Sequence, residues 1–349
     1  MTMLRVRASD ERGIAAAVVM VSMIFILSLL ALVIDGGSMY AHRRAIVNAT
    51  DAAALAAAQA YAGGTAVCGS GDGAAMAAAD GTASANISSP TRNFAAGPAS
   101  GAGTVKVGYR ATAAGLFSGD HEVSTSATAA WGATLGGPGL LPFQLDSTQV
   151  TGACGVPSPT TGTPCSFWYD ANNASSQWGF LNLCSTDAAA HGFCPSSKVG
   201  WNVSPSTQCP NTGNIGAEVI ANGFPYALTM SANPPTYVCI DSGFGPNQFA
   251  AISIGSLGVF PVAVPPPILR NGNPDKYSIV GFTALRILYV GKGNNPTTIA
   301  QCGPMPSWVK PPGSNAECIK MQWQGPVELP GEICTGCTDF GVHSIKLQS

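Results

Sequence analysis

The sequence predicts an α+β protein, in which an N-terminal membrane-spanning helix extends outside the bilayer and is followed by a β-rich, disulfide-stapled ectodomain. Three observations predict this class. Residues 14–34 carry no charge, ten of the eleven cysteines and all six tryptophans lie from Trp131 onward, and short apolar runs alternate with Gly, Pro, Asn and Ser turns after Leu140. The composition changes at residues 136–139 (GGPG), a flexible, helix-breaking segment that we take as the boundary between two regions.

The first element is the apolar run IAAAVVMVSMIFILSLLALVI, which covers residues 14–34. At 1.5 Å per helical residue this run is about 30 Å long, the thickness of the hydrocarbon core of a bilayer. A cleaved signal peptide and a buried core helix are the alternatives, but a cleaved signal would be shorter and would end in a small-x-small site, whereas Asp35 and Gly36 follow here. We therefore expect an uncleaved membrane anchor.

Charge and cysteine usage predict the orientation of this anchor. Three arginines precede the span within residues 1–13, while Arg43 and Arg44 lie further behind it, so the positive-inside rule favours a cytoplasmic N-terminus. Eleven cysteines in a chain rich in Gly and Pro suit an oxidising compartment better than a cytosol. We predict a single-pass protein whose ectodomain is extracytoplasmic.

Strong helix formers continue beyond the span, and no proline occurs before Pro90. The helix is therefore expected to run on to about Ala62 and to stop at Gly63 and Gly64. One face of this extension carries mostly small residues, which suit close packing of another helix or of the protein's own globular part. The candidate partner-binding residues on this face are Met39, Ile46, Ala49 and Ala53.

The ectodomain is predicted to be built from short strands, because its apolar runs are short and rich in β-branched and aromatic residues. The runs are 142–145, 166–169, 180–183, 237–240, 249–254, 258–264, 277–282 and 285–290. Only residues 187–190 and 215–220 suggest short helices.

The cysteines of the ectodomain suggest disulfides, although connectivity cannot be read from the sequence. Local pairing would close loops of roughly 10–30 residues, each worth about 2–4 kcal/mol in the chain-entropy model. The local pairs would be 154 with 165, 184 with 194, 209 with 239, and 302 with 318. Cys68, alone in the alanine-rich part, is the expected unpaired thiol.

Cys334 and Cys337 form a CxxC motif, which is found in zinc half-sites, in thiol redox pairs and in structural disulfides. The sequence has no second CxxC and no histidine at metal-ligand spacing, and no βαβ pattern surrounds the motif. We expect a structural disulfide, and neither a metal site nor a cofactor-binding site.

The overall charge argues against nucleic acid as a partner. The chain has 16 Lys and Arg against 18 Asp and Glu, so charged residues are 10% of the sequence and the net charge is −2. An average soluble protein has roughly 25% charged residues, and basic residues cluster here only at Arg43 and Arg44.

The strongest enzymatic alternative is an anchored or secreted serine hydrolase built on residues 140–349. Residues 251–255 (AISIG) come close to a nucleophile elbow, and Ser253, Asp275 and His343 occur in the chain order of α/β-hydrolases. The elbow needs a helix after the serine, but Gly258 and Pro261 oppose one. We expect Ser253 to be an ordinary strand residue, and we expect no catalytic residue and no small-molecule substrate.

The N-terminal segment resembles a known family. The features that carry the resemblance are Glu11-Arg12-Gly13, residues 33–37 (VIDGG), Tyr40, Arg43 with Arg44, Asn48, Ala49 and residues 51–56 (DAAALA). Through these features, residues 10–62 resemble the N-terminal domain of the TadE/TadG-like proteins of the Flp (tight adherence) pilus assembly system. Weaker matches at 104–107, 115–117 and 123–129 are similar to the short extracytoplasmic strands that follow the helix in this family.

One departure bears on what the resemblance implies. Pilins and TadE-like pseudopilins carry a glutamate five residues into the mature helix, and counting from Ile14 this position is Val18. A glutamate inside a membrane is costly and is kept for a purpose, such as pairing with the N-terminus of a neighbouring subunit. Its absence argues against filament polymerisation, so the resemblance implies the TadG-like branch of anchored accessory proteins.

The resemblance implies a non-enzymatic, membrane-anchored component of a Flp/Tad-type pilus assembly or secretion machine in the bacterial plasma (inner) membrane. The implied partners are the membrane and other Tad/Flp assembly proteins, which the ectodomain would contact. The expected organisation is a cytoplasmic tail at 1–13, a transmembrane helix at 14–34, a TadG-like extracytoplasmic helix with short strands at 35–135, and the ectodomain at 136–349.

Overall fold

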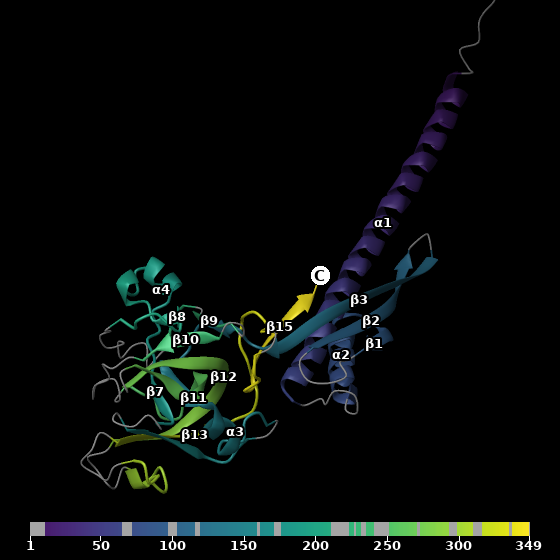
Figure 1. Ribbon diagram of the computed structural model, residues 1–349. Helices are drawn as coiled ribbons and strands as arrows, with labels where there is room; N and C mark the ends of the chain where they lie inside the picture. The colour runs from purple at the N-terminus through teal and green to yellow at the C-terminus, as the bar shows by residue number, and fades with distance from the viewer. Residues whose placement is uncertain are drawn as a thin grey trace, which may run out of the picture.

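A long helix, a small sheet and a larger β-rich unit make up the computed structural model (Figure 1). The helix projects away from the rest of the chain, and the β-rich unit lies at the opposite end from its N-terminus (Figure 1). The structure describes residues 11–64, 72–96, 103–115, 119–158, 161–170, 176–210, 223–226, 228–231, 235–240, 251–270, 273–292, 299–309, 316–334 and 337–348.

Helix α1 covers Glu11–Ala62, 52 residues without interruption. Two glycines end it, as the sequence predicts. The Gly63 N–H donates to the carbonyl of Gln59 at 2.7 Å and the Gly64 N–H donates to the carbonyl of Tyr61 at 3.1 Å. Gly64 has a φ of 67°, a left-handed conformation that glycine adopts at little cost.

The first sheet packs against the C-terminal half of α1, and side chains of α2 (Asp72–Asn86), which lies beside α1, complete the same core. Its strand order is β1-β2-β3-β15-β14. The strands are β1 Thr91–Ala96, β2 Gly103–Gly115, β3 Gly119–Ala133, β14 Val327–Glu328 and β15 Val342–Gln348. Strands β2 and β3 form a long antiparallel hairpin, paired from Gly103 opposite Trp131 to Gly115 opposite Gly119.

Small residues make the core of this first unit. Alternate residues of β2, among them Val105 and Val107, are buried against the helices, while Thr104 and Lys106 between them are exposed. The helix side of this core is mostly alanine: Ala53, Ala54, Ala57 and Ala58 from α1, with Ala75, Ala79 and Ala83 from α2. Because alanine keeps the backbones close, α1 packs closely on α2 and on the sheet.

A hydrogen-bonded cluster ties α2 to the sheet. The Tyr109 hydroxyl donates to Asp80 Oδ1 at 2.7 Å, and Arg92 Nη1 pairs with Asp80 Oδ2 at 3.0 Å. Burial of the Tyr109 side chain, followed by its hydrogen bond to the Asp80 carboxylate, raises the pKa of the phenol well above its ordinary value of 10.0. Tyr109 therefore stays a neutral donor at physiological pH.

The β-rich unit is organised around an eight-stranded sheet with the order β6-β13-β12-β11-β5-β7, in which β10 also pairs with β12 and with β8. Its strands are β5 Phe143–Asp146, β6 Cys165–Asp170, β7 Trp178–Phe180, β8 Trp201–Val203, β10 Thr236–Cys239, β11 Leu257–Arg270, β12 Asn273–Lys292 and β13 Ala316–Trp323. Strands β4 Gly136–Gly137 and β9 Leu228–Thr229 form a two-stranded sheet, and the helical segments are α3 Ser147–Gly152, α4 Thr186–Ala190 and the 3₁₀ turn η1 Ser196–Lys198.

Two hydrophobic clusters pack on this sheet, because successive side chains of β11 and β12 point to opposite faces. Phe260 and Leu285 belong to one cluster, with the fully buried Trp323. Ala263 and Phe282 belong to the other cluster, with Phe224.

The predicted fold class is confirmed: a long apolar N-terminal helix precedes a strand-rich unit with several disulfides, and the whole is α+β. Two of the predicted runs, 277–282 and 285–290, are parts of the single strand β12. The expected strand at 249–254 is wrong for residues 251–254, which form turns ahead of β11. The expected helix at 215–220 lies outside the described residues.

The end of the chain returns to the first sheet. Strand β15 pairs with β3, from His343 opposite Ala133 to Gln348 opposite Thr128. The sequence grouped these residues with 136–349, and no local feature predicted their pairing with β3. The β-rich unit is therefore inserted between two neighbouring strands of the first sheet, β3 and β15.

Candidate functional site: the anchor helix and the joint

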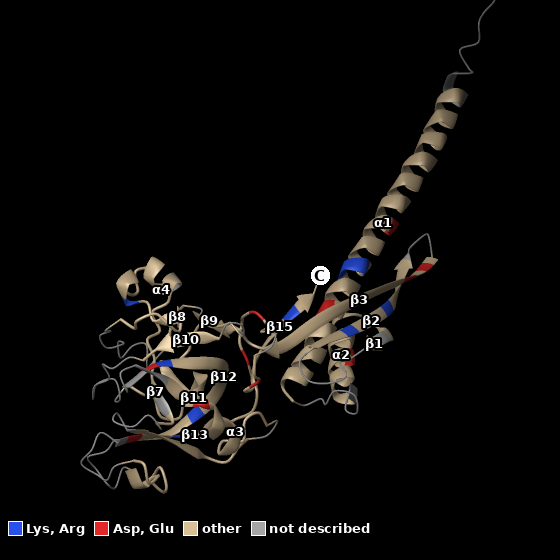
Figure 2. Ribbon diagram, viewed as in Figure 1, with Lys and Arg blue, Asp and Glu red and all other residues tan. Residues whose placement is uncertain are grey.

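The apolar side chains in the N-terminal half of α1 are exposed. Every large apolar side chain between Ile14 and Ile34 is at least 47% exposed. Figure 2 shows no charged residue along this part of the helix. Within the described part of the chain, α1 is the one helix long and apolar enough to cross a membrane, and its most apolar 18-residue window has a mean hydropathy of 3.0. A core helix would be buried, so the exposure favours a single-pass membrane anchor.

The C-terminal half of α1 is covered by the protein itself. Its buried residues recur at intervals of three and four and make one continuous stripe: Ile46, Ala49, Thr50, Ala53, Ala54, Ala57, Ala58, Tyr61 and Ala62. This stripe faces α2, β2 and β3. Asp35, at the end of the apolar run, is also buried, with 6% of its surface exposed. Along the helix, the continuous buried stripe therefore begins at Ile46, beyond the apolar run.

The four candidate residues on the helix face occupy this region. Ile46, Ala49 and Ala53 are buried in the protein's own fold, and Met39 is half-buried. Of the two packing partners that the sequence allowed, the structure places the globular part of the same chain on Ile46, Ala49 and Ala53. A partner protein could reach these three side chains only by displacing the first sheet, so their role in partner binding stays a prediction.

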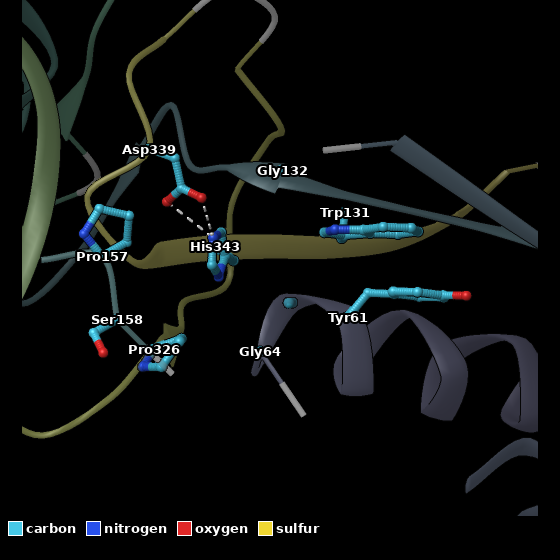
Figure 3. Close-up of a pocket in the computed structure, with 10 residues that line it drawn as sticks. Tyr61, Gly64, Trp131, Gly132, Pro157, Ser158, Pro326, Asp339 and His343 are labelled. Atoms are coloured by element: carbon cyan, nitrogen blue, oxygen red, sulfur yellow. Dashed lines mark hydrogen bonds and ion pairs between the residues drawn. The ribbon is translucent and has the colours of Figure 1, made fainter. Parts of the chain in front are cut away.

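A pocket of about 180 Å³ lies where α1, the first sheet and the β-rich unit meet, a region that we call the joint. Figure 3 shows its walls: Tyr61 and Trp131 stand parallel on one side of His343, and Pro157 and Pro326 lie on the other. The Tyr61 and Trp131 rings are stacked with centroids 4.7 Å apart and planes inclined by 5°. Residues distant in the sequence thus form one small, mainly apolar cavity.

The polar end of this pocket is the pair of Asp339 and His343. His343 Nε2 lies 3.0 Å from both carboxylate oxygens of Asp339, so Nε2 carries the shared proton, and Asp339 Oδ1 also accepts the backbone N–H of Gly341 at 2.7 Å. Partial burial by itself raises the pKa of Asp339, but the hydrogen bond from His343, the His343 charge and the Gly341 N–H together lower it below its ordinary value. Asp339 is therefore ionised at neutral pH.

Further contacts hold the joint together. The Ser344 hydroxyl, which is buried, donates to Thr134 Oγ1 at 2.8 Å. The Cys334 N–H donates to the carbonyl of Ala133 at 2.7 Å, and Thr134 forms a β-bridge with Ile333. The chain that leaves β3 and the chain that returns to β15 are thus linked side by side.

The residues of the hydrolase alternative are not brought together. Ser253 lies exposed in a turn, and its carbonyl accepts the Ser256 hydroxyl at 2.6 Å; strand β11, not a helix, follows it. Our expectation that Ser253 is a strand residue is therefore wrong, although the missing elbow helix is as expected. Asp275 pairs with Lys276 Nζ at 2.6 Å, and His343 pairs with Asp339. The structure gives the hydrolase no support.

Five disulfides link ten cysteines of the β-rich unit. The pairs are Cys154–Cys165, Cys184–Cys194, Cys209–Cys239, Cys302–Cys318 and Cys334–Cys337. The four local pairs considered in the sequence all occur, and the CxxC motif is a disulfide as expected. Cys68 lies outside the described residues. Within the described part of the chain, no three His, Cys, Asp or Glu side chains group in a way that could hold a metal ion.

Sequence reasoning missed the joint pocket. Asp339 and His343 are four residues apart, which is a weak local signal, and Tyr61, Trp131 and Pro157 reach the same place only through the fold. The pairing of β15 with β3 brings these segments together, and a single sequence carries no pattern from which that pairing could be read.

Searches of curated proteins and of solved structures each returned no match. Residues 13–60 match the family model described as "Putative Flp pilus-assembly TadE/G-like", so the N-terminal helix is similar to the N-terminal segment of that family, which is consistent with a TadG-like N-terminal domain.

Proposed function

We propose that this protein is a non-enzymatic, membrane-anchored component of a Flp/Tad-type pilus assembly or secretion machine. The observation that carries the proposal is the division of α1. Its family-matching segment combines an exposed apolar half with a half that is packed into a globular unit. Such a helix holds a folded body at a membrane surface and needs no catalytic group to do so.

In this proposal residues 14–34 span the plasma (inner) membrane, with the N-terminus in the cytoplasm and the rest of the chain outside. From Asp35 to Ala62 the helix extends about 40 Å beyond the bilayer, at 1.5 Å per residue. Five disulfides in the β-rich unit support an oxidising compartment for that unit. The β-rich unit, held at this distance, contacts other assembly proteins.

The anchor is tested by charge substitutions in two regions of the same helix. Ile24→Arg combined with Leu27→Arg puts two charges in the middle of the span, each costing about 2.5–3.5 kcal/mol of insertion free energy. We expect this variant to leave the membrane fraction. Val47→Arg lies on the exposed side of the covered half and serves as the matched control.

The role in assembly is tested in the bacterium that carries the chain. We expect deletion to reduce the number of Flp pili, or the secretion that depends on them, and the wild-type chain and the Ser253→Ala variant to restore it equally. If the wild-type chain restores pili or secretion but the Ser253→Ala variant does not, the hydrolase is favoured. Normal pili after deletion would refute the assembly role.

The proposed orientation is tested by protease protection. Protease added outside the plasma membrane should cut the β-rich unit if this unit is extracytoplasmic.

A further inference from the structure

The joint pocket has walls that suit the stem of a side chain. Its volume, about 180 Å³, is below the roughly 300–1,000 Å³ of pockets that take drug-sized ligands. The stacked rings of Tyr61 and Trp131 and the rings of Pro157 and Pro326 give it mainly carbon surface (Figure 3). An aliphatic stem of a few methylene groups buries its surface well against such rings.

The polar end of the pocket has negative charge to offer. Asp339 keeps half of its side-chain surface exposed, whereas the side chain of His343 is only 9% exposed. The carboxylate accepts N–H groups from His343 and Gly341, and an ionised carboxylate can accept further hydrogen bonds. A carboxylate in contact with solvent beside apolar walls attracts a cation more strongly than one in open water.

Among the described residues that line the pocket, His343 is the one titratable base beside this carboxylate, and at about pH 8 free imidazole is neutral. Among the described residues that line it, none is Lys or Arg. The second polar nitrogen of the histidine, Nδ1, is shielded and has no hydrogen-bond partner. With Nε2 holding its proton toward Asp339, the ring acts as a fixed support for the carboxylate.

We propose that the joint pocket binds an organic cation on an aliphatic stem, namely the ammonium or guanidinium of a lysine or arginine side chain from a partner protein. Asp339 takes the charged head, and the aromatic and proline rings cover the stem. The binding chemistry stands independently of the proposed function, and only the statement that the cation belongs to an assembly partner rests on it. Because the pocket is formed by α1, β3, β15 and the β-rich unit together, a bound side chain contacts both parts of the molecule across the joint.

The test compares two short peptides that differ in one charge. The full chain in lipid nanodiscs is titrated with acetyl-Gly-Lys-Gly-amide and with acetyl-Gly-norleucine-Gly-amide, at low ionic strength and about pH 8, where free imidazole is neutral. Binding is followed by calorimetry. We expect the lysine peptide to bind at least about tenfold more tightly, from one charge-assisted contact. Equal binding of the two peptides would overturn the cation site.

Variants identify the site. We expect Asp339→Asn to weaken the lysine peptide by about tenfold and Asp339→Glu, which keeps the charge, to weaken it less. The matched control is Glu122→Gln, which removes one negative charge from an exposed pair with Arg110. An equal loss with Glu122→Gln would mean a general charge effect and would overturn the proposal. Melting temperatures show whether the Asp339→Asn variant folds. If it does not fold, the loss of lysine-peptide binding is compared between Asp339→Glu and Glu122→Gln: a larger loss with Asp339→Glu supports the site, and an equal loss overturns it.

Free n-butylammonium separates two sources of the same cation. If it binds while the lysine peptide is excluded, the pocket takes a small free amine and the partner-protein assignment is wrong. If the lysine peptide binds as well, the assignment is supported. The two proposals can fail separately. If the lysine peptide binds at Asp339 but deletion of the protein leaves pili unchanged, the proposed function is refuted and the cation site is still supported.

Discussion

Different interactions stabilise the two parts of this molecule. The first unit packs alanines of α1 and α2 against a sheet, and no disulfide joins its described residues. The β-rich unit packs large side chains such as Trp323 and Phe143 and is cross-linked by five disulfides. Close backbone packing leaves no room for larger side chains, whereas cross-links reduce the entropy of the unfolded chain. The first unit should therefore be sensitive to added volume, and the second to loss of its bridges.

The largest expected effect is the loss of the bridge that closes the longest loop. Cys209 and Cys239 are 30 residues apart, so replacing both by serine should destabilise the β-rich unit by about 3–4 kcal/mol in the chain-entropy model. Hydrogen exchange followed by mass spectrometry should show lost protection in β10 and β12, with β2 and β3 unchanged. Equal loss in both units would mean that they unfold together. The shorter loop between Cys184 and Cys194 should cost less.

Added volume in the alanine core should be the next largest effect. Ala53 of α1 is fully buried in the core that α1 shares with α2 and the sheet. Ala53→Phe should therefore destabilise the first unit by about 1–3 kcal/mol through overpacking. Thermal unfolding of the purified chain measures this loss. Ala45→Phe makes the same change on the exposed side of α1 and should have little effect. If the two variants melt alike, α1 does not pack on the sheet as described.

A smaller effect is expected at the cluster that ties α2 to the sheet. Tyr109→Phe removes the hydroxyl that donates to Asp80 at 2.7 Å, and should cost about 1 kcal/mol of unfolding free energy. Denaturant titration measures this loss. The control Tyr40→Phe removes a hydroxyl from a side chain that is 70% exposed, and should cause no measurable loss in the same titration. A neutral Tyr109→Phe would show that Arg92 alone satisfies the Asp80 carboxylate.

The smallest effect concerns pH at the joint. The pKa of Asp339 is lower in the folded protein than its ordinary value of 3.8, so ionised Asp339 stabilises the fold above about pH 4, and this contribution is lost as the pH falls through the lowered pKa. Because half of the side chain is exposed, the contribution should stay below about 1 kcal/mol. The stability difference between wild type and Asp339→Asn should shrink between pH 5 and pH 2. A difference that grew on acidification would contradict the lowered pKa.

Features that depend on near neighbours in the chain could be predicted from the amino-acid sequence. An uncharged run of 21 residues, helix formers up to Ala62 and two glycines behind it define α1, because hydropathy and helix propensity act over a few turns. The signature at residues 51–56 pointed to the similarity with the TadE/G-like family for the same reason, since those residues lie in one uninterrupted helix. The disulfides that close loops of 10 to 30 residues could also be considered from the sequence, because each joins cysteines that are near neighbours in the chain.

Which surfaces pack against each other could be seen only in the folded protein. The spacing of Ile46, Ala49 and Ala53 predicted a packing face but not what covers it, because small residues accept a foreign helix and the chain's own sheet equally well. Strand β15 pairs with β3 across more than two hundred residues, and such pairing depends on backbone hydrogen bonds that any strand could offer. The pocket that unites Tyr61, Trp131 and Asp339 exists only because of that pairing, so a single sequence could not reveal it.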